Sequence, residues 1–154
     1  MSGPNVGQVR TPVGLISIHE DAGAITRVTW TGENRGARSD LLRHAIAQIE
    51  AYFAGDRHEF DLPLRVDGSD FQRAVCERMQ AIPFGETCTY GDIARELDAP
   101  PQPVGQACGG NPIPIIIPCH RVVGAQSLGG FSGAGGVDCK VALLRHEGAY
   151  GLLI

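Results

Sequence analysis

Residues 89–122 decide the fold of this chain, and they read TYGDIARELDAPPQPVGQACGGNPIPIIIPCHRV. Thr89 and Asp92 form a capping-box pair ahead of an apolar run, which predicts a helix that ends at about Leu97. A pair of prolines then separates this helix from another short one, at about residues 102–109. Two short helices across a tight connection are the pattern of a helix-turn-helix.

An apolar stretch, residues 113–118, then leads to an adjacent cysteine and histidine, Cys119 and His120. A thiol is a weak nucleophile until it loses its proton, and a neighbouring imidazole removes that proton directly or through one water. Pro114 and Pro118 restrict the backbone on either side of three isoleucines and stiffen the approach to the thiol. The alternative from adjacency alone is a buried structural cysteine beside a surface histidine, which is the commoner case.

The first 66 residues are predicted to form a small α/β scaffold domain. Residues 13–19 and 25–30 alternate apolar with polar or small side chains, and the turn-forming residues between them predict a β-hairpin. Apolar residues follow helical spacing over residues 42–53, and Gly55 then provides a stop. Residues 56–68 are interpreted as a linker.

Residues 67–154 are predicted to form the second domain. It opens with a capping box, Ser69 to Gln72, and a helical apolar stripe that Pro83 ends. The glycine-rich segment 124–136 is interpreted as a loop that lines a pocket, because glycine lets the backbone approach a ligand closely; the alternative is a disordered linker. A final helix that ends at Glu147 is expected to carry three apolar residues on one face: Val137, Val141 and Leu144.

Composition limits the classes of protein. The chain has 154 residues, 43% hydrophobic and 19% charged, which fits one domain or two small ones, and no apolar stretch is long enough for a transmembrane helix. The N-terminus lacks the pattern of a secretory signal, so a cytoplasmic location is expected. Five cysteines at irregular spacing, with no Cys-x-x-Cys pair, predict neither a disulfide framework nor a metal site.

The net charge is −4, and the second part of the chain is the more acidic one. Residues 67–154 hold six Lys and Arg against nine Asp and Glu. Because neutralised phosphates supply most of the non-specific affinity for DNA, this balance disfavours tight, non-specific binding to DNA.

Further motifs surround the Cys-His pair in a fixed order. They are Phe71-Gln72, IPFGET at 82–87, Thr89-Tyr90, Val104-Gly105, NPIP at 111–114, PCHRV at 118–122, FSG at 131–133 and HEG at 146–148. In these motifs the chain resembles the O6-alkylguanine-DNA alkyltransferases, also called methylated-DNA–protein-cysteine methyltransferases. The resemblance covers nearly all of residues 67–154 and is weak over residues 1–66. It implies an α/β (α+β) fold, with a small N-terminal α/β scaffold domain ahead of a winged helix-turn-helix-like catalytic domain.

The resemblance implies DNA repair by irreversible, stoichiometric transfer of a methyl or larger alkyl group to Cys119, from O6 of guanine or also from O4 of thymine. It implies no cofactor, because the cysteine itself accepts the group and keeps it as a stable thioether. The implied partner is double-stranded DNA carrying O6-alkylguanine, bound through the minor groove with the damaged base flipped out. The protein is expected to act as a monomer, away from membranes.

The resemblance also implies roles within the site. His120 is the general base, acting through water, and Glu147 orients its imidazole and stabilises the charged form. Asn111 ties the recognition helix to the active-site segment, and Tyr90 meets the flipped base and protonates or steers it. The residues implied to contact substrate or DNA are Gln102, Pro114, Arg121, Val122, Phe131, Ser132 and Lys140.

Several positions depart from the family's pattern, and Gln102 is the most serious of these departures. Gln102 stands where the family has an arginine that fills the space left by the flipped base, and glutamine has neither the permanent charge nor the planar cation.

Two alternative functions stay open: a sensor that flips alkylated bases without transferring the group, and an alkyltransferase that acts on bulky or single-stranded adducts. Relatives of the sensor kind usually have tryptophan in place of the cysteine, so Cys119 argues against the first alternative.

Overall fold

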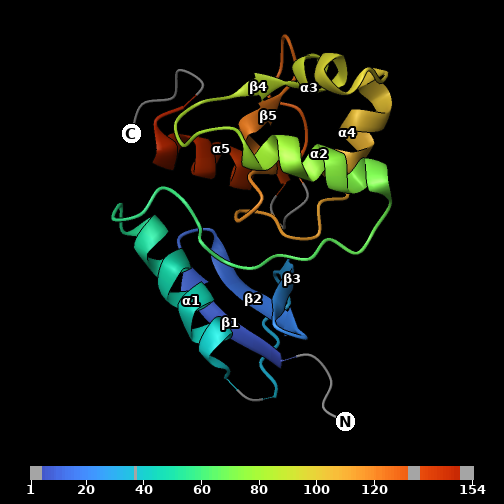
Figure 1. The fold of residues 1–154 in the computed structure, drawn as a ribbon. Helices are drawn as coiled ribbons and strands as arrows, with labels where there is room; N and C mark the ends of the chain where they lie inside the picture. The colour runs from blue at the N-terminus through green and yellow to red at the C-terminus, as the bar shows by residue number, and fades with distance from the viewer. Residues whose placement is uncertain (1–4, 37, 132–135, 150–154) are drawn as a thin grey trace. The chain divides into compact units, whose positions relative to one another are not determined.

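The computed structural model describes residues 5–36, 38–131 and 136–149. The chain divides into two compact units, Met1–Asp67 and Gly68–Ile154. A small antiparallel sheet with one helix makes up the described part of the first unit, and helices dominate the second (Figure 1). The expected α/β (α+β) fold class is confirmed.

In the first unit, three strands form an antiparallel sheet in the order β1 (Asn5–Thr11), β2 (Gly14–Asp21) and β3 (Ala24–Thr29). Helix α1 (Asp40–Phe53) packs on β1 and β2 (Figure 1). The predicted hairpin corresponds to β2 and β3, and the predicted helix corresponds to α1, so both predictions are confirmed.

Strand β1 is absent from the sequence prediction, because a glycine occupies one of its inward positions. A Cβ atom on Gly7 would lie 3.1 Å from Cδ1 of Ile46, so glycine lets α1 approach the sheet and removes the apolar alternation that marks a strand. The segment interpreted as a linker also joins the sheet. Ile25 N donates to Pro63 O at 2.8 Å, and Arg65 N donates to Ile25 O at 3.0 Å.

The regular elements described in the second unit are α2 (Asp70–Gln80), β4 (Cys88–Thr89), α3 (Tyr90–Leu97), α4 (Pro101–Gly109), β5 (Val122–Val123) and α5 (Gly136–Glu147). Strands β4 and β5 pair in parallel, with Cys88 opposite Val122. This pairing brings the start of α3 beside the segment that follows Cys119 (Figure 1).

Helices α3 and α4 form the predicted helix-turn-helix. Asp92 N donates to Thr89 Oγ1 and Thr89 N donates to Asp92 Oδ2, both at 3.0 Å, so the capping box at the start of α3 is confirmed. At the start of α2 only half of the expected box forms. Ser69 Oγ accepts from Gln72 N, but the Gln72 side chain donates to Ala107 O and so ties α2 to α4.

The buried face of α5 differs from the prediction. Val137 is 46% exposed and Val141 is half-buried, whereas the residues buried on this helix are Cys139, Lys140, Leu143, Leu144 and Glu147. The prediction assumed that polar side chains face outward. Here a lysine and a glutamate occupy the inward face, so of the three apolar residues expected on one face only Leu144 is buried.

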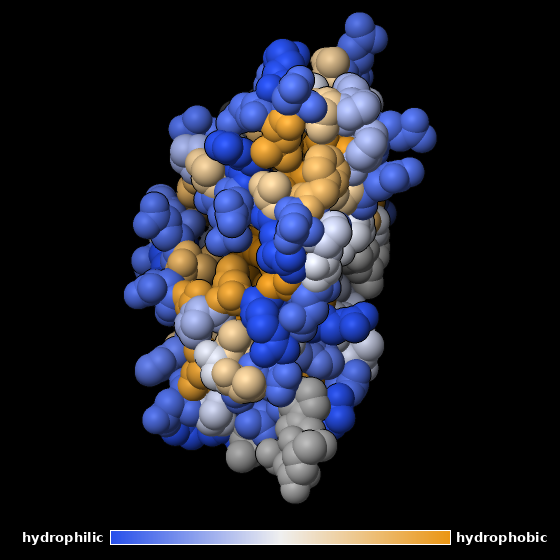
Figure 2. All heavy atoms as spheres, turned by 45° about the vertical axis from the view of Figure 1, so that its right-hand side comes forward, coloured by the Kyte–Doolittle hydropathy of each residue, from blue (hydrophilic) through white to orange (hydrophobic). Residues whose placement is uncertain are grey.

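Hydrophilic residues cover much of the face drawn in Figure 2, with hydrophobic residues in groups between them. In the part of the chain that the structure describes, none of the helices combines the length and the hydropathy of a membrane span. Within the same residues, no cluster of three or more His, Cys, Asp and Glu side chains is arranged to hold a metal ion.

Candidate active site

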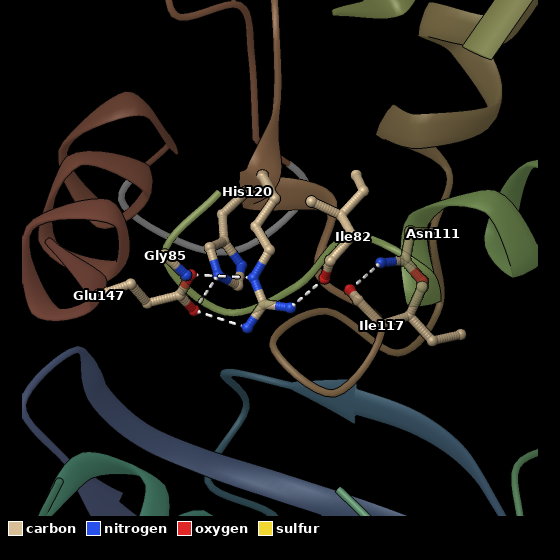
Figure 3. A network of polar contacts seen from close by, with 7 residues as sticks. Ile82, Gly85, Asn111, Ile117, His120 and Glu147 are labelled. Atoms are coloured by element: carbon tan, nitrogen blue, oxygen red, sulfur yellow. Dashed lines mark hydrogen bonds and ion pairs between the residues drawn. The ribbon is translucent and has the colours of Figure 1, made fainter. Parts of the chain in front are cut away.

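A tight turn precedes Cys119 and sets its position. Ile117 N donates to Ile113 O at 2.8 Å, and Ile115 within the turn has a φ of +73°, a left-handed conformation that β-branched residues rarely adopt. The Asn111 side chain holds both ends of the turn: Nδ2 donates to Ile117 O at 2.9 Å (Figure 3), and Oδ1 accepts from Ile113 N at 3.0 Å. Since Asn111 follows α4, its amide links the helix-turn-helix to the residues that place the cysteine.

Cys119 begins a short 3-10 turn, Cys119–Arg121, and is 3% exposed. Its backbone N donates at 2.8 Å to Ile117 O, the carbonyl that also accepts from Asn111. The cysteine is therefore fixed by the same hydrogen bonds that hold the strained turn, and it stands next to a fully buried histidine.

The fold brings His120 onto the carboxylate of Glu147, which belongs to α5. The distance from His120 Nε2 to Glu147 Oε2 is 2.7 Å, and both side chains are fully buried. Gly85 N donates to the other oxygen, Oε1, at 3.4 Å (Figure 3). The carboxylate is thus held from two sides, and its distance to the ring is that of a charge-assisted hydrogen bond.

The electrostatics of this pair leave His120 neutral, with one ring nitrogen able to accept a proton. Burial raises the pKa of Glu147, but hydrogen bonds from His120 and Arg121 outweigh burial and hold the pKa well below its usual range. An ionised carboxylate only accepts, so Nε2 carries the hydrogen, and Nδ1 of a neutral ring keeps a lone pair. Nδ1 is buried and has no hydrogen-bond partner among the described residues. Burial also lowers the pKa of His120, against the attraction of Glu147, so the ring rests neutral at pH 7.

Arg121 has a different partner from the substrate or DNA expected of it. Its Nε donates to Glu147 Oε1 at 2.8 Å, its Nη2 donates to Oε2 at 3.0 Å, and its Nη1 donates to Ile82 O at 2.6 Å. The side chain is 7% exposed and stacks near the ring of Phe84. This bidentate pair positions the carboxylate that holds His120, and it leaves the guanidinium little exposed surface for a phosphate.

Lys140 is another buried cation at the site, on α5. Its Nζ donates to Val122 O at 2.6 Å and to Gly130 O at 2.9 Å. Burial lowers the pKa of Lys140 to about 8, against the attraction of Cys119 and Cys108. The ammonium therefore joins β5 to the glycine-rich loop, close to the nucleophile.

Tyr90 begins α3 and lies against the same loop. A Cβ atom on Gly129 would clash with the Tyr90 hydroxyl, and Gly129 has a φ of +73°, so both space and backbone require glycine here. Burial raises the pKa of Tyr90, as do Cys108 and Cys119, while a backbone hydrogen bond at Gly130 opposes them. At neutral pH the phenol keeps its proton and can donate it.

The other four cysteines are held as thiols. Burial raises the pKa of Cys108 to about 12, and it raises the pKa of Cys88 and Cys139 to about 11. The pKa of Cys76 is raised for the same reason. Since the thiolate is the reactive form, these four side chains are poor nucleophiles at neutral pH.

The remaining predicted residues lie in different places. Gln102 is exposed on the first turn of α4, outside the buried network. Pro114 is buried in the turn before Cys119 and bridges to Ile117, and Phe131 is half-buried. Ser132 lies outside the described residues.

The loop after α2 contributes two backbone groups that the sequence analysis did not assign. Ile82 O accepts from Arg121, and Gly85 N donates to Glu147 (Figure 3). Backbone groups carry no residue-type signal, so only the motif that contains them, residues 82–87, pointed to this loop.

Comparison with known proteins matches both units of the chain to models of one family. The family model described as "6-O-methylguanine DNA methyltransferase, DNA binding domain" matches residues 70–149, and the "6-O-methylguanine DNA methyltransferase, ribonuclease-like domain" model matches residues 7–66. A methylated-DNA–protein-cysteine methyltransferase of Mycolicibacterium paratuberculosis is 40% identical in an alignment 154 positions long, which covers 90% of this chain and 89% of that protein. The protein of that name from Archaeoglobus fulgidus is 46% identical in an alignment 107 positions long, which covers 67% of this chain and 73% of that protein.

Solved structures are similar as well. The crystal structure of the Mycobacterium tuberculosis O6-methylguanine methyltransferase superposes with a TM-score of 0.83 at 35% identity, covering 95% of this chain and 93% of that one. A crystal structure of Mycobacterium tuberculosis OGT in complex with DNA has a TM-score of 0.80 at 37% identity, covering 92% of this chain and 91% of that one.

Proposed function

The chain belongs to the family of 6-O-methylguanine DNA methyltransferases, and from this premise we propose that it repairs DNA by transferring an alkyl group from O6 of guanine to Sγ of Cys119. The transfer is irreversible, since the thioether is stable, and each protein molecule acts once. The observation that carries the proposal is the buried contact of His120 with Glu147 directly beside Cys119, with Nδ1 of His120 left to accept a proton.

The reaction is an in-line displacement at the alkyl carbon. His120 takes the proton of the Cys119 thiol through a water molecule, and the ionised Glu147 stabilises the imidazolium that forms. The S–C bond forms as the bond from carbon to guanine O6 breaks, and the electron pair of that bond stays on guanine. Tyr90 supplies a proton to guanine, which stays in the DNA as an unmodified base, and the imidazolium of His120 returns the proton taken from the thiol to the phenolate through solvent.

Recognition of the base follows from the residues around the cysteine. The carbonyl of Val122 and the backbone amide of Ser132 read the guanine edge, and Pro114 and Phe131 form walls of the pocket. Lys140 borders the pocket and keeps Val122 in place through its bond to the carbonyl.

The partner is DNA that carries O6-alkylguanine. Where the lesion lies in a duplex, α4 approaches from the minor groove and the base flips out of the stack to reach Cys119. We propose that the protein does this as a monomer, in the cytoplasm and without a cofactor.

Intact-protein mass spectrometry tests the proposal. After incubation with free O6-benzylguanine or with an oligonucleotide carrying O6-methylguanine, the protein should gain the mass of one benzyl or one methyl group, respectively. Cys119→Ala should gain no mass with either substrate, whereas Cys139→Ala should gain one group with each substrate, like the wild type. A mass gain retained in Cys119→Ala would exclude Cys119 as the acceptor.

A further inference from the structure

The outer surface of α4 carries no charged side chain. Its residues read PQPVGQACG, and the exposed ones include two neutral glutamines at helical spacing, Gln102 and Gln106. Resting on the alkyl transfer proposed above, we infer that this protein takes O6-alkylguanine preferentially from single-stranded DNA, and repairs an intact duplex slowly.

The start of α4 also offers few hydrogen-bond donors to a phosphate. The first backbone N–H groups of a helix have no partner within the helix, and they can bind a phosphate oxygen. In α4 the first and third residues are Pro101 and Pro103, which have no N–H, so the first turn has lost half of these donors. The residue before the helix, Pro100, makes no side-chain hydrogen bond to the helix start and offers no polar side chain to a phosphate.

The arginines of the neighbouring helices do not replace the missing charge. Over residues 70–109 there are three arginines against six Asp and Glu. Each of these arginines is paired: Arg73 with Asp70, Arg78 with Glu96 and Arg95 with Asp92. Elsewhere in the second unit, Arg121 and Lys140 are buried in the active site, and Arg145 is exposed in the last turn of α5, outside these three helices. A phosphate that approaches α2, α3 and α4 therefore meets a surface with a net negative charge.

This surface matters most for a duplex. A duplex presents two phosphates for each base pair, and it also holds the damaged base by stacking and pairing. A protein repairs such a base only after supplying the free energy that unpairs and unstacks it, which usually comes from contacts with the DNA backbone. A base in a single strand needs little of that free energy, so the buried site acts on it without strong contacts from α4.

The test compares single-turnover rates of Cys119 methylation for one sequence containing O6-methylguanine, as a single strand and as a duplex, over a salt series. We expect the single strand to react at least about tenfold faster. Both rates should change little with salt, with a log–log slope below about 2 in magnitude, because few phosphates are neutralised. Free O6-benzylguanine serves as the reference substrate.

The outcomes separate the strand preference from the proposed function. A duplex rate equal to or above the single-strand rate would overturn the preference and leave the alkyl transfer intact. A protein that is labelled by none of the three substrates would overturn the proposed function itself.

A matched pair of variants tests the role of charge on α4. Gln106→Arg adds a cation to the face of α4, whereas Gln80→Arg adds the same charge to the exposed end of α2. The first should raise the duplex rate at low salt by at least about threefold and steepen its salt dependence by up to about one unit of slope. The second should leave the rate unchanged. An equal response in both variants, or in neither, would contradict the argument that charge on α4 limits duplex repair.

Discussion

At the scale of single residues, the site depends on a carboxylate that accepts hydrogen bonds from two buried side chains. Glu147 accepts from His120 and from Arg121, and both contacts are buried. Arg121 keeps the carboxylate ionised, and the ionised carboxylate sets the tautomer in which Nδ1 of His120 is the acceptor. His120 therefore depends on Arg121 although no hydrogen bond between these two residues is described.

His120→Ala and Glu147→Gln should each slow methyl transfer at pH 7 by about 10²-fold or more, because the thiol loses its base or the base loses its stabilising charge. The rate of His120→Ala should rise steadily with pH, because hydroxide in the solvent must then remove the proton of the thiol. Single-turnover rates from pH 5.5 to 9 provide the measurement. His44→Ala and Glu50→Gln, on exposed positions of α1, are the controls. Wild-type rates at pH 7 in both site variants would refute the relay.

Arg121→Met should lower the free energy of unfolding at pH 7 by about 3–5 kcal/mol, because it leaves a buried carboxylate without its main partner. The pKa of Glu147 is depressed in the folded protein, so the pair contributes stability above the unfolded pKa of about 4.3 and loses it as the pH falls below that value. The difference between wild type and variant should therefore narrow between pH 5 and pH 3.

Urea denaturation at pH 7, 5, 4 and 3 measures this effect. The double variant Arg121→Met with Glu147→Gln removes both charges, and it should recover part of the stability that the single variant loses. A deficit in Arg121→Met that stays constant over the whole range would show that packing, and not charge, accounts for the loss.

At the scale of elements, the turn over residues 113–117 couples the helix-turn-helix to the nucleophile. Its strain at Ile115 persists because Asn111 bonds both ends, and the same carbonyl of Ile117 then fixes Cys119. A substitution at the end of α4 therefore alters the position of the Cys119 thiol through the turn, without direct contact with the thiol.

Asn111→Ala should destabilise the protein by about 2–4 kcal/mol and slow transfer, because it removes two buried hydrogen bonds and leaves Ile113 N unpaired. Asn111→Asp keeps the acceptor for Ile113 N, but it replaces the donor to Ile117 O by a second oxygen, which the carbonyl repels. This variant should therefore recover only part of the stability and rate that Asn111→Ala loses. Thermal unfolding and single-turnover rates are the measurements, with the exposed Asn34→Ala as control. Full activity in Asn111→Ala would show that the turn holds its shape without the amide.

At the scale of the whole molecule, five free cysteines share one chain, and one of them has a base beside it. Burial keeps the pKa values of Cys76, Cys88, Cys108 and Cys139 above that of an ordinary thiol. The fold thus separates one reactive side chain from four of the same type.

Iodoacetamide at pH 7.5 should therefore add one group rapidly to the native protein and reach all five thiols only in urea. Prior reaction with O6-benzylguanine should abolish the rapid addition, because both reagents use Cys119. Intact mass against time measures the number of groups, and Cys108→Ala is the control that should keep the rapid phase. A rapid addition that survives in Cys119→Ala would place the reactive thiol elsewhere.

The sequence by itself determined the local elements of this protein and the order of its motifs. The capping box at Thr89, the prolines before α4 and the alternation in the hairpin are short-range signals, so they predict structure before any tertiary contact forms. The Cys119–His120 pair is likewise a local feature, and its surrounding motifs identify the chemistry.

Only the tertiary structure decided how the buried polar residues pair. Arg121 meets Glu147 across 26 residues, and Lys140 meets the carbonyl of Val122 across 18. Periodicity assigns charged side chains to the solvent, so it gave no sign that these cations are inside, and on α5 it identified Leu144 but neither Lys140 nor Glu147 as buried. A buried charge is stable only with a partner at hydrogen-bond distance, and that partner is set by the packing of distant segments, which no local pattern records.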